Sequence, residues 1–142
     1  MTTYESNIKT ISSSEEVVFG ILSNLNNLEE FTKNEQLSDK LKDVTFDADS
    51  CSFMVDGFGK VGFRIIEKEP FKTIKFTTEH VPVEVNAWIQ LKQVDEKDTR
   101  MKLTLKAELP AMIKMMVNKK IEEGINAIAD LLTNALNAKL NG

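Results

Sequence analysis

A repeat of apolar residues at spacings of three and four runs through residues 110–140. This spacing places the apolar side chains on one face of an α-helix. Pro110 suits the first turn of that helix, where its missing N–H group would have no partner. About 28 residues at a rise of about 1.5 Å give a rod of about 42 Å, which needs a large apolar partner surface. The apolar face comprises Ile113, Val117, Ile121, Ile125, Ile128, Leu132 and Ala135, and the opposite face, which suits water, comprises Lys119, Glu122, Asn126, Asp130, Thr133 and Asn137.

The middle of the chain alternates between apolar and polar residues with a period of two, which predicts strands. Glycines in residues 56–59 indicate a tight turn, and Pro70 ends a strand because it cannot donate to a ladder. Strands that follow one another through short turns should pair antiparallel. The expected strands are residues 44–48, 51–55, 61–65, 74–78, 83–92 and 101–107.

The N-terminal part predicts a strand followed by two short helices. Residues 4–11 alternate loosely and are read as the first strand. Ser13 and Glu16 have the spacing of a capping box, in which each side chain binds a free backbone N–H of the other residue. A helix over residues 13–28 follows, and Leu37 and Leu41 are spaced for a second short helix.

Composition indicates one ordinary globular domain over residues 1–142, with 42% hydrophobic and 28% charged residues. A net charge of −4 argues against a nucleic-acid partner. The N-terminus has no basic cluster followed by an apolar run, and no stretch is long enough for an integral membrane segment. Cys51 is the only cysteine, so no internal disulfide can form, and we expect a cytoplasmic protein.

These elements predict an α+β fold in which a curved seven-stranded antiparallel sheet wraps around the long C-terminal helix, with two short helices between strands 1 and 2. The arrangement resembles the START-like helix-grip superfamily (SRPBCC), which includes polyketide cyclase/dehydratase-like and lipid-transfer domains. The matching features are the capped helix over residues 13–28, the hairpins over residues 44–78, the last hairpin over residues 88–91 and 99–105, and the final helix that follows Leu109 and Pro110. The resemblance implies a hydrophobic ligand held between the sheet and the last helix.

Residues that carry catalysis or bind metals are sparse. His80 is the only histidine and falls in an expected loop, where a solvated side chain is the commoner role. Cys51 falls on the apolar side of its strand, which favours a buried and inert thiol. No zinc or calcium spacing is present, so we expect neither a metal nor another cofactor.

Several residues of the long helix are candidates for a ligand site. For the methionines, ordinary packing against Phe31 and the expected second short helix is the alternative, and it is the one we favour. Met112 and Met116 lie where apolar residues surround most of the helix, and methionine adapts to variable shapes. Lys120 lies at the edge of the apolar face, where it could reach a ligand carboxylate or phosphate or keep its charge in water. Gly124 falls in the apolar face, which a close approach to the sheet or room for a ligand would explain. We therefore expect the methionine-rich first two turns to act as a gate, residues 112–120 to set ligand specificity, and residues 125–135 to be fixed core.

The first functional hypothesis is the binding or carrying of a small, largely hydrophobic molecule or lipid without catalysis. A second is a polyketide cyclase/dehydratase-like enzyme that uses Thr78, His80 and Lys120. A third is a protein-interaction module that uses the outer sheet face around Trp88, which alternation places with Asn86 and Gln90, although a bulge could turn it inward. A homodimer is left open. The expected ligand-binding residues are Phe53, Phe63, Phe76, Ile89, Leu103, Met112, Met116, Lys120 and Gly124.

Overall fold

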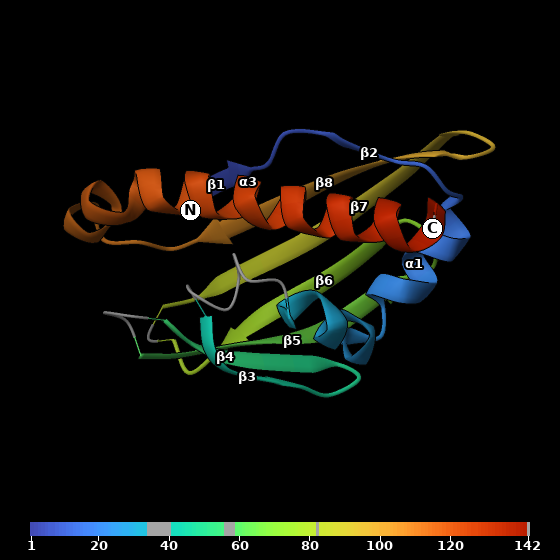
Figure 1. Ribbon diagram of the computed structural model, residues 1–142. Coiled ribbons are helices and arrows are strands. Elements are labelled where there is room, and N and C mark those ends of the chain that lie inside the picture. Colours follow the sequence, from blue (N-terminus) through green and yellow to red (C-terminus); the bar gives the residue numbers. More distant parts are fainter. Residues whose placement is uncertain (34–40, 56–58, 82, 142) are drawn as a thin grey trace.

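The computed structural model describes residues 1–33, 41–55, 59–81 and 83–141 (Figure 1). The long helix lies across one face of a sheet, and the two shorter helical segments lie beside its C-terminal end (Figure 1). The elements in chain order are β1 (Thr2–Glu5), β2 (Lys9–Ile11), α1 (Glu15–Leu22), the 3-10 helix η1 (Leu25–Lys33), β3 (Leu41–Phe46), β4 (Ser50–Val55), β5 (Gly59–Glu69), β6 (Thr73–Glu79), β7 (Val85–Asp95), β8 (Asp98–Ala107) and α3 (Ala111–Asn141).

The strands form one antiparallel sheet in the order β1-β8-β7-β6-β5-β4-β3, with β2 also paired to β8. The expected α+β helix-grip architecture is therefore confirmed. The expected first strand is two short strands, so the sheet has eight strands rather than seven. Both short strands pair with β8, at Tyr4 opposite Leu105 and at Thr10 opposite Arg100.

The first helix differs from its prediction at both ends. Its N-cap is Ser14, whose hydroxyl accepts the N–H of Val17, so the expected capping box of Ser13 and Glu16 is wrong by one residue. The α-helix ends at Leu22, and η1 replaces the rest of the expected helix. The expected second short helix falls mainly on residues 34–40, outside the described residues, and Leu41 belongs to β3.

The side chain of Glu15 fixes the start of α1 on the sheet. Its carboxylate accepts hydrogen bonds from the Lys72 ammonium group and from the backbone N–H of Gln93. The distance from Gln93 N to the carboxylate oxygen is 3.1 Å. The hydrogen bond from Lys72 is the largest cause that lowers the pKa of Glu15. This contact holds α1 at one end of the sheet.

The buried face of α3 is rotated from the expected one and is confined to the second half of the helix. Ile125, Ala129, Leu132 and Leu136 are buried, whereas Ile128, expected on the buried face, is 47% exposed. Thr133, expected in water, is buried and donates its hydroxyl to the carbonyl of Ala129 at 2.7 Å, which satisfies the polar group. The helix packs mainly on β1, β2 and β8.

A polar stripe of α3 binds the N-terminal segment instead of facing water. Its members lie at helical spacing, and most accept hydrogen bonds from residues of β1 or from residues that flank β2. The contacts are Tyr4 Oη to Asn118 Oδ1 (2.7 Å), Asn7 N to Asn126 Oδ1 (2.8 Å), Ser12 N to Asn137 Oδ1 (2.8 Å), Asn137 Nδ2 to Thr10 O (3.1 Å) and the ion pair of Lys9 with Asp130. The stripe therefore sets the position of α3 at the β1–β2 side of the sheet.

The hydrophobic core lies between the inner sheet face, α1, η1 and the second half of α3. Its members alternate with polar residues along the strands, as the period of two predicts. It comprises Tyr4, Ile11, Val18, Phe19, Leu22, Leu25, Ile65, Ile74, Phe76, Ile89, Leu91, Met101, Leu103, Ile125, Ala129, Leu132 and Leu136.

Candidate functional site

A rim of half-buried apolar residues borders the core on the inner sheet face. Helices α1 and α3 do not cover this face evenly, because α3 packs mainly on β1, β2 and β8, while α1 packs on β7. The rim residues from the strands, the β8–α3 connection and the first half of α3 are Phe46, Cys51, Phe63, Ala87, Leu105, Leu109 and Ile121. The inner face is thus apolar beyond the part that is fully buried.

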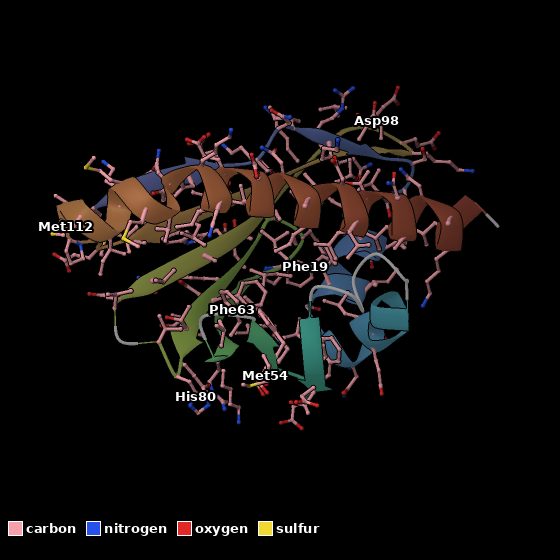
Figure 2. The ribbon with its side chains drawn as sticks, turned by 60° about the vertical axis from the view of Figure 1, so that its left-hand side comes forward. Phe19, Met54, Phe63, His80, Asp98 and Met112 are labelled. Carbon is pink, nitrogen blue, oxygen red and sulfur yellow. The ribbon has the colours of Figure 1, made fainter. Side chains whose placement is uncertain are left out.

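Phe53 extends this rim by stacking on Phe63. Their rings stack at a centroid distance of 6.1 Å and an interplanar angle of 25°. Both rings are half-buried, and Phe63 also packs against the core. In Figure 2, Phe63 lies on the side of the strands that faces α3, whereas Met54, the neighbour of Phe53 in β4, lies on the far side. The pair offers a flat apolar surface that suits an aromatic or aliphatic group.

Three other expected ligand residues belong to the core itself. Phe76, Ile89 and Leu103 are at most 8% exposed. Ile89 lies directly opposite Leu103 in the β7–β8 register, and Phe76 lies opposite Ala87. These residues form the floor behind the rim.

The first two turns of α3 are the most exposed apolar segment of the described chain. Met112, Met115 and Met116 are 79%, 85% and 74% exposed, and Ile113 is 42% exposed. Met112 lies at the N-terminal end of α3, well separated from Phe63 and Phe19 (Figure 2). No residue of the first half of α3 is fully buried, so the structure separates an exposed half from a core half at about Gly124.

Gly124 makes no close approach to the sheet. A Cβ atom built on it would meet nothing within 4 Å, although the residue is half-buried. Of the two explanations offered by the sequence, the structure therefore favours open space beside the helix.

The polar residues of the enzyme hypothesis are not brought together. Thr78 lies opposite Phe63 on the inner face, and its hydroxyl donates to the carbonyl of Val85 at 3.4 Å. His80 has a positive φ of 66°, and its ring lies beside the outer side of Gly62. Lys120 is exposed on α3. His80 follows the end of β6 at Glu79, and its left-handed backbone directs the side chain to the outer face, away from Thr78.

Two adjacent hollows lie on the outer face of β3–β5 and were not anticipated from the sequence. Their volumes are about 190 and 260 Å³, and Thr45 and Ser52 line both. The hydroxyls of these two residues share a hydrogen bond of 2.7 Å, and the first hollow also includes Gly62, Glu79 and His80. The polar positions of the alternating pattern in β3 and β4 indicate which side chains lie on the outer face. They do not indicate whether that face is hollowed.

Trp88 lies on the outer sheet face, as alternation favoured. Its neighbour Ile89 is buried in the core, and the ammonium groups of Lys75 and Lys106 lie over the indole ring. No bulge turns the residue inward, since it pairs in register with Lys75 and Thr104.

Cys51 behaves as a packed thiol. It lies on the inner face opposite Phe46 and Phe63, and burial raises its pKa to about 11. Within the described residues, no group of His, Cys, Asp and Glu side chains is arranged to hold a metal ion.

The raised pKa of Cys51 gives a direct test with a thiol reagent. Because the folded protein keeps the thiol protonated, the thiolate fraction at pH 8 should be about a hundredfold lower than for an ordinary cysteine. Alkylation by iodoacetamide, followed by mass spectrometry, should therefore be slow at pH 8 and should accelerate up to about pH 11. The chain unfolded in guanidinium chloride serves as the control and should react at the ordinary rate, and equal rates in both states would contradict the burial of this thiol.

Solved structures with the same fold come from distant proteins. The chain superposes on norcoclaurine synthase from Thalictrum flavum in complex with dopamine and hydroxybenzaldehyde, with a TM-score of 0.73, 11% identity and coverage of 95% of this chain and 87% of that chain. A protein from Thermobifida fusca gives a TM-score of 0.67 at 11% identity, covering 96% and 93%. The Aha1 dimer from Colwellia psychrerythraea gives 0.63 at 18% identity, covering 96% and 97%. At these identities the likeness shows the helix-grip fold alone.

Comparison with protein families identifies the chain more specifically. Among curated proteins, none matches the chain at a significant level. No helix in the described part of the chain combines the length and apolar character that a membrane span requires. Residues 9–141 match the family of CoxG, which is described as a subunit of carbon monoxide dehydrogenase. The chain therefore belongs to the CoxG family.

Proposed function

We propose that this protein binds a small, largely hydrophobic molecule or lipid beside the inner sheet face, without catalysing a reaction. The observation that carries the proposal is the apolar rim around Phe63, where the core continues as half-buried side chains. Covering apolar surface that is partly in water contributes about 25 cal/mol per Å², and this contribution must exceed the entropy lost when the ligand binds.

The proposed ligand lies between the stacked pair of Phe53 and Phe63 and the first half of α3. Gly124 leaves room on the helix, and the half-buried Ile121 borders the same core as Phe63. The norcoclaurine synthase structure, which shares this fold, contains two small aromatic molecules by its description. The fold can thus accommodate molecules of this size, which supports the proposal for the present chain.

The methionines at the start of α3 are proposed as the entrance to this site. Met112 and Met116 expose flexible side chains that can cover ligands of different shape. Lys120, four residues beyond Met116, places an ammonium group where it can pair with a carboxylate or phosphate of an amphipathic ligand.

Binding without chemistry is favoured over the cyclase/dehydratase-like alternative. General acid–base catalysis needs its groups within hydrogen-bond reach of one substrate. Thr78 and His80 lie on opposite sheet faces, and the Thr78 hydroxyl already donates a hydrogen bond to the carbonyl of Val85.

Cytoplasmic location and homodimer formation stay predictions.

The proposal is tested by native mass spectrometry of protein purified without detergent and by titration with 1-anilinonaphthalene-8-sulfonate, a dye that fluoresces in apolar sites. We expect a bound species that organic solvent releases, and saturable dye binding. The double change Met112→Gln and Met116→Gln should weaken the dye several-fold. The matched control is Met54→Gln on the outer face, where Met54 is 37% exposed, and this change should have no effect. The absence of both a bound species and saturable dye binding would contradict the proposal.

A further inference from the structure

The outer face of the sheet carries a mixed aromatic and cationic patch centred on Trp88. The ammonium nitrogen of Lys75 lies 5.5 Å from the centroid of the indole ring, and that of Lys106 lies 5.7 Å from it. These distances fall within the range of cation–π interaction. Ile66, 50% exposed in the bulge of β5 opposite Lys75, adds an aliphatic surface.

The two lysines of this patch are not held in ion pairs within the described part of the chain. The nearest carboxylates in register are Glu67, directly opposite Lys75, Glu5, diagonal to Lys106 across β1 and β8, and Glu108, two residues beyond Lys106. Among the described residues, neither lysine lies within ion-pair distance of a carboxylate. Two other cations of this face are paired, Lys102 with Glu5 and Arg100 with Asp98.

The patch is unusual for a chain with a net charge of −4. On β7, the partners of the two patch lysines are uncharged, because Lys75 lies opposite Trp88 and Lys106 lies opposite Asn86. A negatively charged partner would pair with the two ammonium groups.

We propose that the Trp88 patch, defined by Ile66, Lys75, Trp88 and Lys106, binds a short acidic segment of a partner protein. Glutamate or aspartate side chains of the partner pair with Lys75 and Lys106, and an apolar or aromatic side chain packs on Trp88 and Ile66. Partly exposed tryptophan flanked by cations is typical of the anchors that dominate protein interfaces. The patch lies on the sheet face opposite the proposed ligand site, so both can be occupied together.

Two other partner classes fit less well. Small-molecule sites are concave, and the hollows described on this face lie over β3–β5 rather than at Trp88. Nucleic acids are bound by extended tracts of positive charge, whereas this chain is acidic and concentrates two lysines at one aromatic residue.

The test uses the intrinsic fluorescence of Trp88, the only tryptophan in the chain. The probe is a synthetic peptide with several glutamates and one phenylalanine, and its control is the same peptide with glutamines. We expect a saturable change in Trp88 emission with the acidic peptide alone, weakened by added NaCl because the charges are exposed. The double change Lys75→Gln and Lys106→Gln should weaken binding by about tenfold while the circular dichroism spectrum is retained.

Matched controls separate this site from general charge effects. The double change Lys97→Gln and Lys119→Gln removes the same charge from exposed positions of the β7–β8 turn and of α3, and it should leave peptide binding unchanged. The proposal is overturned if the Trp88 emission shows no saturable change at millimolar peptide. It is also overturned if both double variants lose the same affinity for the acidic peptide, or if the protein binds single-stranded oligothymidylate more tightly than the peptide. Dye binding at the inner face is measured in the same variants, so a failure of the ligand proposal is distinguished from a failure of this one.

Discussion

Replacement of Leu136 by alanine is expected to lower the free energy of unfolding by about 2–5 kcal/mol. Leu136 is fully buried in the second half of α3, where it packs with Leu132 and Ala129 against the inner sheet face. Truncation removes apolar contacts and leaves a cavity that the surrounding strands can fill only in part. Urea unfolding followed by circular dichroism measures the change.

The control for this prediction is Ile128→Ala on the same helix. Ile128 is 47% exposed, so its truncation should cost less than about 1 kcal/mol. The sequence alone predicts the larger loss of stability for Ile128→Ala, because the expected apolar face included Ile128 and omitted Leu136. Equal costs for the two changes would show that α3 is rotated from the orientation described above.

Gly124→Leu is expected to weaken binding of the naphthalene dye by about tenfold or more, equivalent to about 1.4 kcal/mol. A side chain at this position enters open space, since a Cβ atom meets nothing within 4 Å. Under the proposed function that space belongs to the ligand, so leucine competes with it. Titration of the dye, with the unfolding midpoint measured in parallel, provides the result.

Gly124→Ala separates this blocking effect from an effect on helix stability. Alanine adds a single carbon and removes the cost of glycine inside a helix, so the protein should be stabilised by up to about 1 kcal/mol with little change in dye binding. If leucine and alanine leave dye binding equally intact, the ligand does not lie beside Gly124. If alanine destabilises the protein, the space beside the helix is occupied.

The alternation of apolar and polar residues was sufficient to predict the architecture. Period-two segments became β3–β8, and the long repeat near the C-terminus became α3. The interruption between β1 and β2 was not predictable, because it depends on how Ser6 and Asn7 bind β8 and α3. Ser6 exchanges hydrogen bonds with Leu103, and the backbone N–H of Asn7 binds Asn126, which are contacts across about a hundred residues of sequence.

The candidate site was predictable only as a set of residue types. Alternation placed Phe53 and Phe63 on the inner face and Trp88 on the outer face. It could not show that Phe76 is core while Phe63 lies at the rim, because both are phenylalanines at the same strand phase. How much of the inner sheet face is covered depends on where α3 docks. That position is determined by Asn126, Asp130 and Asn137, which were expected to face solvent but bind the N-terminal segment. The direction of His80 depended on one backbone dihedral angle that no local pattern indicates.

The asparagine contacts of α3 have a consequence for the order in which the protein is made. The N-terminal residues 4–12 find their helix partners between Asn118 and Asn137, separated by 114–127 positions along the chain. At a synthesis rate of about 5–20 residues per second, they wait roughly 6–25 s for these partners to emerge. A growing chain can pair its middle strands early, because β4–β8 are consecutive in the chain and adjacent in the sheet. The pairing of β1 and β2 with β8 and the docking of α3 can be completed only after residues 118–137 have been synthesised, so these contacts form after the middle strands have paired.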